Sequence, residues 1–158
     1  MTHTAPQSLH ALPAKSKTTT YSVHVQFGDC DPAGIVFFPN FSKWMDAASL
    51  HFFMACGIPP WRELVKTTGI IGTPLVEINT RFLRPATYGE TIRIDTCIVE
   101  WNRKTIKQQH TVWRDDAGAR TVLCIGTETR AFCVLKDPLD AASIKAIEVP
   151  EFIKLACC

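Results

Sequence analysis

The sequence lacks the features that would place the protein in a membrane, in a secretory pathway or on a nucleic acid. No apolar stretch approaches the roughly 20 residues needed to cross a bilayer. The first twenty residues contain no apolar segment of the kind found in secretion signals. A formal net charge of +2 is too small to predict a nucleic-acid partner. We therefore expect a cytoplasmic protein with no membrane or nucleic-acid partner.

Metal-binding patterns are also absent. The chain contains no CxxC or HExxH motif, and its five histidines are scattered. Its seven cysteines are an odd number, and without a secretion signal they do not predict a disulfide framework. Only the terminal pair, Cys157 and Cys158, is placed to bind a metal or oxidise adventitiously. We expect reduced thiols, no functional metal site and no cofactor.

The composition is that of one globular domain that follows a polar tail. Hydrophobic residues make up 46% of the chain and charged residues 20%, and 158 residues are enough to bury a core. The N-terminal residues are rich in Ser, Thr, Pro and Lys. We predict a flexible tail over residues 1–19 and a single domain over residues 20–158.

One long helix and five strands are predicted. Residues 21–27 alternate between apolar and polar side chains, as a half-buried strand does. Residues 39–56 carry apolar side chains at helical spacing, with Pro39 in the first turn and Gly57 after the end. Short turns separate the remaining strands, which favours antiparallel neighbours. The expected α+β fold is an antiparallel sheet of about five strands wrapped around one long central helix. The other strands are expected at 75–84, 91–101, 105–114 and 120–135.

The loop FGDCDPAGIVFFPNF (27–41) is the strongest candidate for chemistry, because it combines two carboxylates and a thiol. Pro32 disfavours an α conformation at Asp31 and stiffens the loop around it. The Asp31 carboxylate is placed to act at a carbonyl, or to bond loop amides as Asp often does in turns. Asp29 is expected to fix loop amides. Cys30 has no histidine nearby in the sequence to activate it, so we expect a small buried hydrophobe.

Six segments of the sequence carry a family resemblance, and they occur in this order: FGDCDPAGIVFFPNF (27–41), WMDAAS (44–49), CGIPPW (56–61), GIIGTP (69–74), TCIVEW (96–101) and AIEVPEFI (146–153). In this order they resemble the hotdog-fold acyl-CoA thioesterases, and within them the 4-hydroxybenzoyl-CoA thioesterase family. The resemblance runs from about Tyr21 almost to the end of the chain. A sister branch of short-chain acyl-CoA thioesterases usually has His where this chain has Phe38 and Glu where it has Asp46, so both residues favour the aromatic-acyl branch.

The resemblance implies catalytic roles for two residues of the loop. Asp31 would attack the thioester carbonyl to give an acyl-enzyme anhydride, or it would deprotonate a water molecule, and the family favours attack. The backbone N–H of Phe38, at the positive end of the helix, would stabilise the oxyanion.

Three further residues match family positions around the acyl group. By resemblance, Asp46 would meet the 4-hydroxyl of the substrate ring. From the residues alone, a carboxylate on so apolar a helix must face water, a cation or a ligand. The alternative to a ligand contact is an ion pair or a hydrogen bond within a subunit interface. Trp61 and Thr73 match positions near the acyl pocket, and a packing tryptophan and a turn threonine are their alternatives.

The turn WNRKT (101–105) matches a family turn that contacts the nucleotide of coenzyme A. Arg103 and Lys104 fit that role, and Arg suits forked contacts to phosphate. Asn102 stands where the family usually has another Arg, which weakens the expected contact. Basic hairpin turns also serve solubility alone.

The implied function is hydrolysis of an aromatic acyl-CoA, first of all 4-hydroxybenzoyl-CoA, to the free acid and CoA. The family implies a homotetramer, a dimer of dimers, with sites at subunit interfaces, and a place in the degradation of aromatic compounds. Two alternatives stay open: a thioesterase for short-chain or other aryl-CoA esters, and a non-catalytic acyl-CoA-binding module on the same scaffold.

Overall fold

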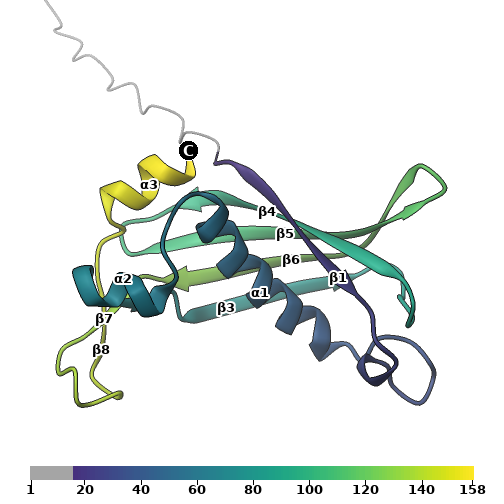
Figure 1. Ribbon diagram of the computed structural model, residues 1–158, viewed down its shortest axis with the longest axis horizontal. Helices are drawn as coiled ribbons and strands as arrows, with labels where there is room; N and C mark the ends of the chain where they lie inside the picture. Colours follow the sequence, from purple (N-terminus) through teal and green to yellow (C-terminus); the bar gives the residue numbers. More distant parts are fainter. Residues whose placement is uncertain (1–15) are drawn as a thin grey trace, which may run out of the picture.

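A five-stranded antiparallel sheet wraps around one helix in the computed structural model, which describes residues 16–158 (Figure 1). The strand order is β1-β4-β5-β6-β3, and every neighbouring pair is antiparallel. The predicted α+β architecture is confirmed. The strands are β1 (Thr18–His24), β3 (Leu75–Phe82), β4 (Thr91–Trp101), β5 (Thr105–Asp116) and β6 (Ala119–Ala131).

Helix α1 (Pro39–Ala55) lies across the concave face of this sheet (Figure 1). Pro39 occupies the first turn, where its missing N–H costs nothing. Gly57, with a φ of 88°, turns the chain away after the helix end. No helix within residues 16–158 is long and apolar enough to span a membrane. The side chains that α1 buries are those of Phe41, Trp44, Met45, Ala48, Ser49, Phe52 and Phe53.

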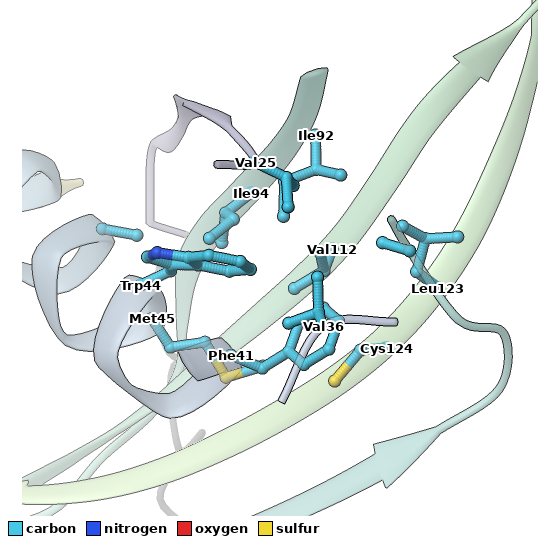
Figure 2. Packing of buried hydrophobic residues seen from close by; sticks show 12 residues of the cluster. Val25, Val36, Phe41, Trp44, Met45, Ile92, Ile94, Val112, Leu123 and Cys124 are labelled. Carbon is cyan, nitrogen blue, oxygen red and sulfur yellow. The ribbon is translucent and has the colours of Figure 1, made fainter. Parts of the chain in front are cut away.

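Two hydrophobic clusters form the core, one toward each end of α1. In the first, Phe41, Trp44 and Met45 of α1 pack against strand residues that include Ile94 and Val112 (Figure 2). The second cluster contains Phe52 and Phe53 of α1 together with side chains of α3 (Glu151–Cys157). Polar side chains lie buried between these clusters, and we call them the polar layer. Its members are Ser49, Thr96, Gln108, His110, Glu128 and Arg130.

A second, three-stranded sheet was not predicted. Its order is β2-β7-β8, and helix α2 (Trp61–Thr68) precedes it. The expected single strand 120–135 is wrong in this respect, because β6 ends at Ala131 and the chain continues in the other sheet. Strands of three residues are too short to show a clear period, so the sequence alone does not distinguish them from a connection or from part of a longer strand. The three strands are β2 (Ile70–Gly72), β7 (Cys133–Leu135) and β8 (Ile144–Ala146).

The N-terminal boundary of the domain differs from the expected one. Residues 1–15 of the predicted tail lie outside the described residues. Thr18 and Thr19, which the prediction assigned to the tail, pair with Cys97 and Thr96 in the large sheet. The sheet domain therefore starts before residue 20. Three consecutive threonines look like a polar linker in sequence, but β-branched residues also suit an edge strand.

Gly126 leaves the space on β6 that Met45 of α1 fills. A Cβ atom at position 126 would overlap the Sδ and Cε atoms of Met45, whose side chain is fully buried. We expect Gly126→Ala to lower the free energy of unfolding by about 1–3 kcal/mol, because the end of the buried Met45 side chain must leave its packed position. Urea denaturation measures this change.

The matched control for this prediction is Gly28→Ala. A Cβ at position 28 meets nothing within 4 Å, so that variant should stay within about 0.5 kcal/mol of wild type. A Gly126→Ala variant as stable as Gly28→Ala would contradict the packing argument.

Candidate active site

The loop before α1 presents the Asp31 carboxylate on a braced backbone. The N–H of Asp31 donates to the carbonyl oxygen of Ile35 at 2.8 Å, and the N–H of Phe37 donates to that of Asp29 at 2.9 Å. The side chain of Asp31 is half-buried, and its Oδ1 accepts from the N–H of Ala33 at 2.8 Å. Its Oδ2 accepts no hydrogen bond from any described residue. One carboxylate oxygen is therefore available for chemistry.

Asp29 and Cys30 have structural contacts instead. Oδ2 of Asp29 accepts from the N–H of Gln26 at 2.8 Å, and its carbonyl oxygen accepts from Nδ2 of Asn40 at 2.8 Å. These bonds tie the loop to the first turn of α1. The half-buried Cys30 packs against the first hydrophobic cluster. The contacts of both residues support the structure of the loop.

The N–H of Phe38 is the open donor at the N-terminus of α1. The N–H of Val36 donates to the carbonyl of Ala86 at 2.9 Å, and that of Phe37 is used by Asp29. Phe38 is the N-cap of α1, and within residues 16–158 its N–H has no acceptor. Helix N-termini attract negative charge, so this N–H suits an oxyanion.

Asp46, Trp61 and Thr73 line one cavity of about 290 Å³, which we call the Asp46 cavity. Asp46 comes from α1, Trp61 from the start of α2, and Thr73 from the connection between β2 and β3. Three residues predicted from separate segments thus meet in space. The remaining lining residues are Ser49, Leu50, Pro74, Leu75 and Arg130.

A second hollow, of about 320 Å³, lies beside Phe38 and is called the Phe38 hollow. Phe82 lines it at one end of β3, whereas Leu75, at the other end of β3, lines the Asp46 cavity. Seven strand steps separate these residues by about 23 Å. Phe38 and Asp46 themselves are eight positions apart along α1, about 12 Å. In one chain they line separate openings. The hollow is lined by Ile35, Val36, Phe38, Phe41, Phe82, Leu83, Arg84 and Pro85.

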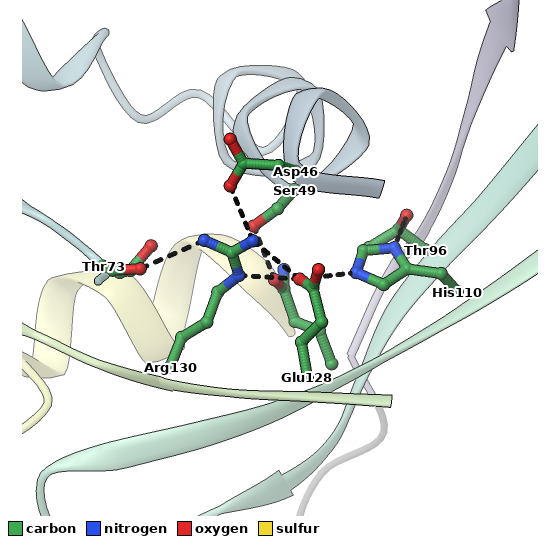
Figure 3. A network of polar contacts seen from close by, with 8 residues as sticks. Asp46, Ser49, Thr73, Thr96, His110, Glu128 and Arg130 are labelled. Carbon is green, nitrogen blue, oxygen red and sulfur yellow. Dashed lines mark hydrogen bonds and ion pairs between the residues drawn. The ribbon is translucent and has the colours of Figure 1, made fainter. Parts of the chain in front are cut away.

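Arg130, which the sequence reasoning did not single out, supplies the cation that faces Asp46. Its Nη2 donates to Oδ1 of Asp46 at 2.8 Å, and its Nη1 donates to the carbonyl oxygen of Thr73 at 3.1 Å. In Figure 3 its guanidinium lies between Asp46, Thr73 and Glu128. Asp46 therefore forms an ion pair, which was one alternative to a ligand contact. Both residues of the pair line the Asp46 cavity.

Glu128 anchors Arg130 inside the polar layer. Its Oε2 accepts from Nε of Arg130 at 2.8 Å and from Nε2 of His110 at 3.0 Å. Burial acts to raise the pKa of Glu128, but the hydrogen bonds and charges of His110 and Arg130 outweigh it, and the pKa lies below its usual value. Glu128 is therefore ionised at neutral pH.

A signal for this pair exists in the sequence. In the strand GTETRA, Glu128 and Arg130 alternate with Thr127 and Thr129, so both charged side chains share one face with Gly126. That face is buried against α1, and two charges on a buried strand face indicate an internal ion pair.

Comparison with known proteins identifies the fold family. Residues 25–156 match the model of the thioesterase-like superfamily. The chain belongs to that superfamily. It is 44% identical to the 4-hydroxybenzoyl-CoA thioesterase of Pseudomonas sp. (strain CBS-3) over 142 residues, which cover 89% of this chain and 98% of the relative. The predicted hotdog thioesterase family is confirmed, and with it the class of thioester hydrolase.

Solved thioesterase structures agree with this assignment. An Asp-to-Asn mutant of 4-hydroxybenzoyl-CoA thioesterase, in complex with 4-hydroxybenzoyl-CoA, matches with a TM-score of 0.84 at 40% identity, covering 89% of this chain and 99% of that chain. A gentisyl-coenzyme A thioesterase matches with a TM-score of 0.70 at 32% identity, covering 88% and 98%.

The basic turn of this thioesterase-like protein lies between β4 and β5. The carbonyl of Arg103 accepts from the N–H of Val149 at 2.8 Å, and that of Lys104 accepts from the N–H of Phe132 at 3.2 Å. Nε of Arg103 lies 3.4 Å from Oε1 of Glu148, and both side chains are exposed. The backbone of the turn is therefore fixed, while the Arg103 side chain can exchange an exposed carboxylate for a phosphate.

The buried thiols of this thioesterase-like protein are poor nucleophiles. Burial raises the pKa of Cys56, Cys133 and Cys157, and that of Cys124 to about 12. They therefore stay protonated at neutral pH. In the described part of the chain, no group of three or more His, Cys, Asp or Glu side chains is placed to hold a metal ion.

Proposed function

We propose that the protein hydrolyses an aromatic acyl-CoA, with 4-hydroxybenzoyl-CoA as its substrate, to the free acid and CoA. The observation that carries the proposal is the Asp46 cavity. There a carboxylate with one open oxygen lies among the apolar walls of Leu50, Trp61 and Leu75. Such a cavity suits an aromatic ring that carries a hydrogen-bond donor. The name of the relative with 44% identity supports the same substrate.

Asp31 and Phe38 act on the thioester in this proposal. Oδ2 of Asp31 attacks the carbonyl carbon, and the N–H of Phe38 donates to the developing oxyanion. The carbon–sulfur bond then breaks, and CoA leaves as the thiolate. Water hydrolyses the resulting anhydride to the free acid and restores the carboxylate. In the alternative route, the same oxygen takes a proton from the water that attacks the thioester.

Assembly through β3 would complete the site. Leu75, Ile78 and Phe82 of this edge strand are 46%, 39% and 48% exposed, although Ile78 and Phe82 pair with inward residues of β6. Unpaired apolar edges favour pairing with another chain. Two-fold pairing of β3 with a second copy brings the Asp46 cavity of one chain next to the Phe38 hollow of the other. We expect such dimers to form a dimer of dimers.

The remaining parts of the proposal concern coenzyme A and the setting. Arg103 and Lys104 would contact the phosphates of CoA, with Arg103 released from Glu148. We expect no cofactor, a cytoplasmic location and a role in the degradation of aromatic compounds.

Thiol release tests the proposed substrate directly. We expect kcat/KM for 4-hydroxybenzoyl-CoA to exceed that for benzoyl-CoA by about 100-fold, because a cavity built around a carboxylate discriminates against a ring without a donor. Hydrolysis of both esters is followed by titration of free CoA with a thiol reagent. Equal values would contradict 4-hydroxybenzoyl selectivity, and ester binding without thiol release would favour the acyl-CoA-binding module.

A second candidate is a thioesterase for another hydroxylated aryl-CoA. The match to a gentisyl-coenzyme A thioesterase favours it over a short-chain substrate. Gentisyl-CoA and a short-chain acyl-CoA belong in the same assay, and a higher kcat/KM for either would replace the first candidate.

A further inference from the structure

Arg130 connects the polar groups of the Asp46 cavity to the polar layer of the core. Its three nitrogens bond to three separate elements: Asp46 on α1, the carbonyl of Thr73 before β3, and Glu128 on β6 itself. The guanidinium is planar and forked, so each bond constrains the direction of the others. A single side chain thus sets the relative position of two cavity walls.

The two carboxylates on Arg130 have opposite surroundings. The side chain of Glu128 is 1% exposed and that of Asp46 is 72% exposed, while Arg130 itself is 6% exposed. A buried carboxylate without a cation is very costly, so Arg130 stays with Glu128 whether or not Asp46 is present. An ion pair as exposed as that of Asp46 contributes little to stability. Asp46 therefore depends on Arg130 for its position, and the fold does not depend on Asp46.

Glu128 is held in turn by two strands behind it. Nε2 of His110 on β5 lies 3.0 Å from Oε2 of Glu128, and Nδ1 of His110 lies 2.8 Å from Oγ1 of Thr96 on β4. An ionised carboxylate only accepts hydrogen bonds, so His110 carries a proton on Nε2. Both His110 and Thr96 are fully buried. Figure 3 shows these contacts as one continuous path that runs through Thr96, His110, Glu128, Arg130 and Asp46.

We propose that Arg130 is a positioning residue that determines acyl specificity: it holds Asp46 so that the cavity selects an aromatic acyl group with a hydroxyl donor. This inference rests on the proposed function. Arg130 occupies Oδ1 of Asp46, and Oδ2 accepts no hydrogen bond within the described residues. Oδ2 is thus left for the phenolic O–H. An O–H donates a shorter and stronger hydrogen bond to a carboxylate oxygen than to a neutral one.

The test compares Arg130→Lys with wild type on 4-hydroxybenzoyl-CoA and benzoyl-CoA. Lysine keeps the positive charge that Glu128 requires but lacks the forked geometry that reaches three elements. We expect the ratio of kcat/KM values for the two esters to fall about tenfold. If this variant does not fold, the double variant Glu128→Gln/Arg130→Gln, which removes both buried charges together, takes its place.

A double-mutant cycle separates positioning from general damage. In an Asp46→Asn background, Arg130→Lys should cause no further fall in the ratio, because both residues act through the same carboxylate. The control is Arg120→Lys on the same strand. Arg120 lies over Trp113 and pairs with Asp95 at 2.7 Å, outside both the cavity and the polar layer. In Arg120→Lys, the ratio of kcat/KM values for the two esters should equal that of wild type.

Each outcome supports or contradicts a defined statement. Equal losses on both esters in Arg130→Lys, or additive losses in the cycle, would show a merely structural role and overturn the inference. Unchanged kcat/KM values for both esters in Arg130→Lys would overturn it as well, while leaving the proposed function intact. A wild type with no preference between the esters would instead contradict the proposed substrate, and the inference that rests on it.

Discussion

Asp31→Asn is expected to lower kcat for 4-hydroxybenzoyl-CoA by about 10³-fold or more while the ester still binds. The amide has the size of the carboxylate but neither its charge nor its nucleophilicity. Because an amide oxygen can still accept from the N–H of Ala33, the loop should keep its conformation. Stopped-flow or steady-state thiol release measures kcat, and titration calorimetry on the inactive variant measures ester binding.

Asp29→Asn is the matched control for this prediction. An amide oxygen at position 29 can still accept from the N–H of Gln26, as the carboxylate does at 2.8 Å. We expect a loss of less than about tenfold, because Asp29 acts on the loop rather than on the substrate. Full activity in Asp31→Asn, or an equal loss in both variants, would show that the loop only supports a site elsewhere.

Ile78→Lys is expected to separate the protein into monomers and to lower activity by about 100-fold or more. Ile78 lies in the middle of β3, is 39% exposed, and has β6 on one side only. Lysine on an edge strand opposes pairing with another chain. Without pairing, the Asp46 cavity and the Phe38 hollow remain at opposite ends of one strand, so no complete site forms. Light scattering and thiol release measure the two effects on one sample.

Ile144→Lys provides the control for the edge-strand prediction. Ile144 is 50% exposed on β8, the edge strand of the small sheet. The same chemical change there should leave assembly and turnover as in wild type. If Ile78→Lys remained assembled and active, the site would not depend on β3 pairing. If it dissociated yet kept full activity, one chain alone would suffice for catalysis.

Local patterns in the sequence were sufficient for the main elements. Alternation with period two and spacing of 3.6 residues identify the strands and α1, because each element buries one face. Pro39 and Gly57 mark the ends of α1 correctly, since one lacks an N–H and the other adopts positive φ. The small sheet was missed because strands of three residues carry no period, and their pairing depends on distant partners.

The candidate reactive groups of the loop could also be predicted from neighbouring positions in the sequence. Asp31 and Phe38 lie within eight residues of one another, so proline stiffening and the helix terminus could be argued from neighbouring positions. Family resemblance supplied Asp46, Trp61 and Thr73, which the structure then collects around one cavity. Their roles toward a substrate stay predictions.

Only the tertiary structure decided what Asp46 faces and which predicted residues share an opening. Arg130 lies 84 positions from Asp46 in the chain, and they meet because α1 packs on the face of β6 that carries Arg130. The Asp46 cavity and the Phe38 hollow are likewise separate because opposite ends of β3 line them. Sequence by itself determined which segments form elements and which loop carries reactive groups. Long-range packing determined which charges pair, because contact between distant residues depends on sheet order and register, which local patterns do not encode.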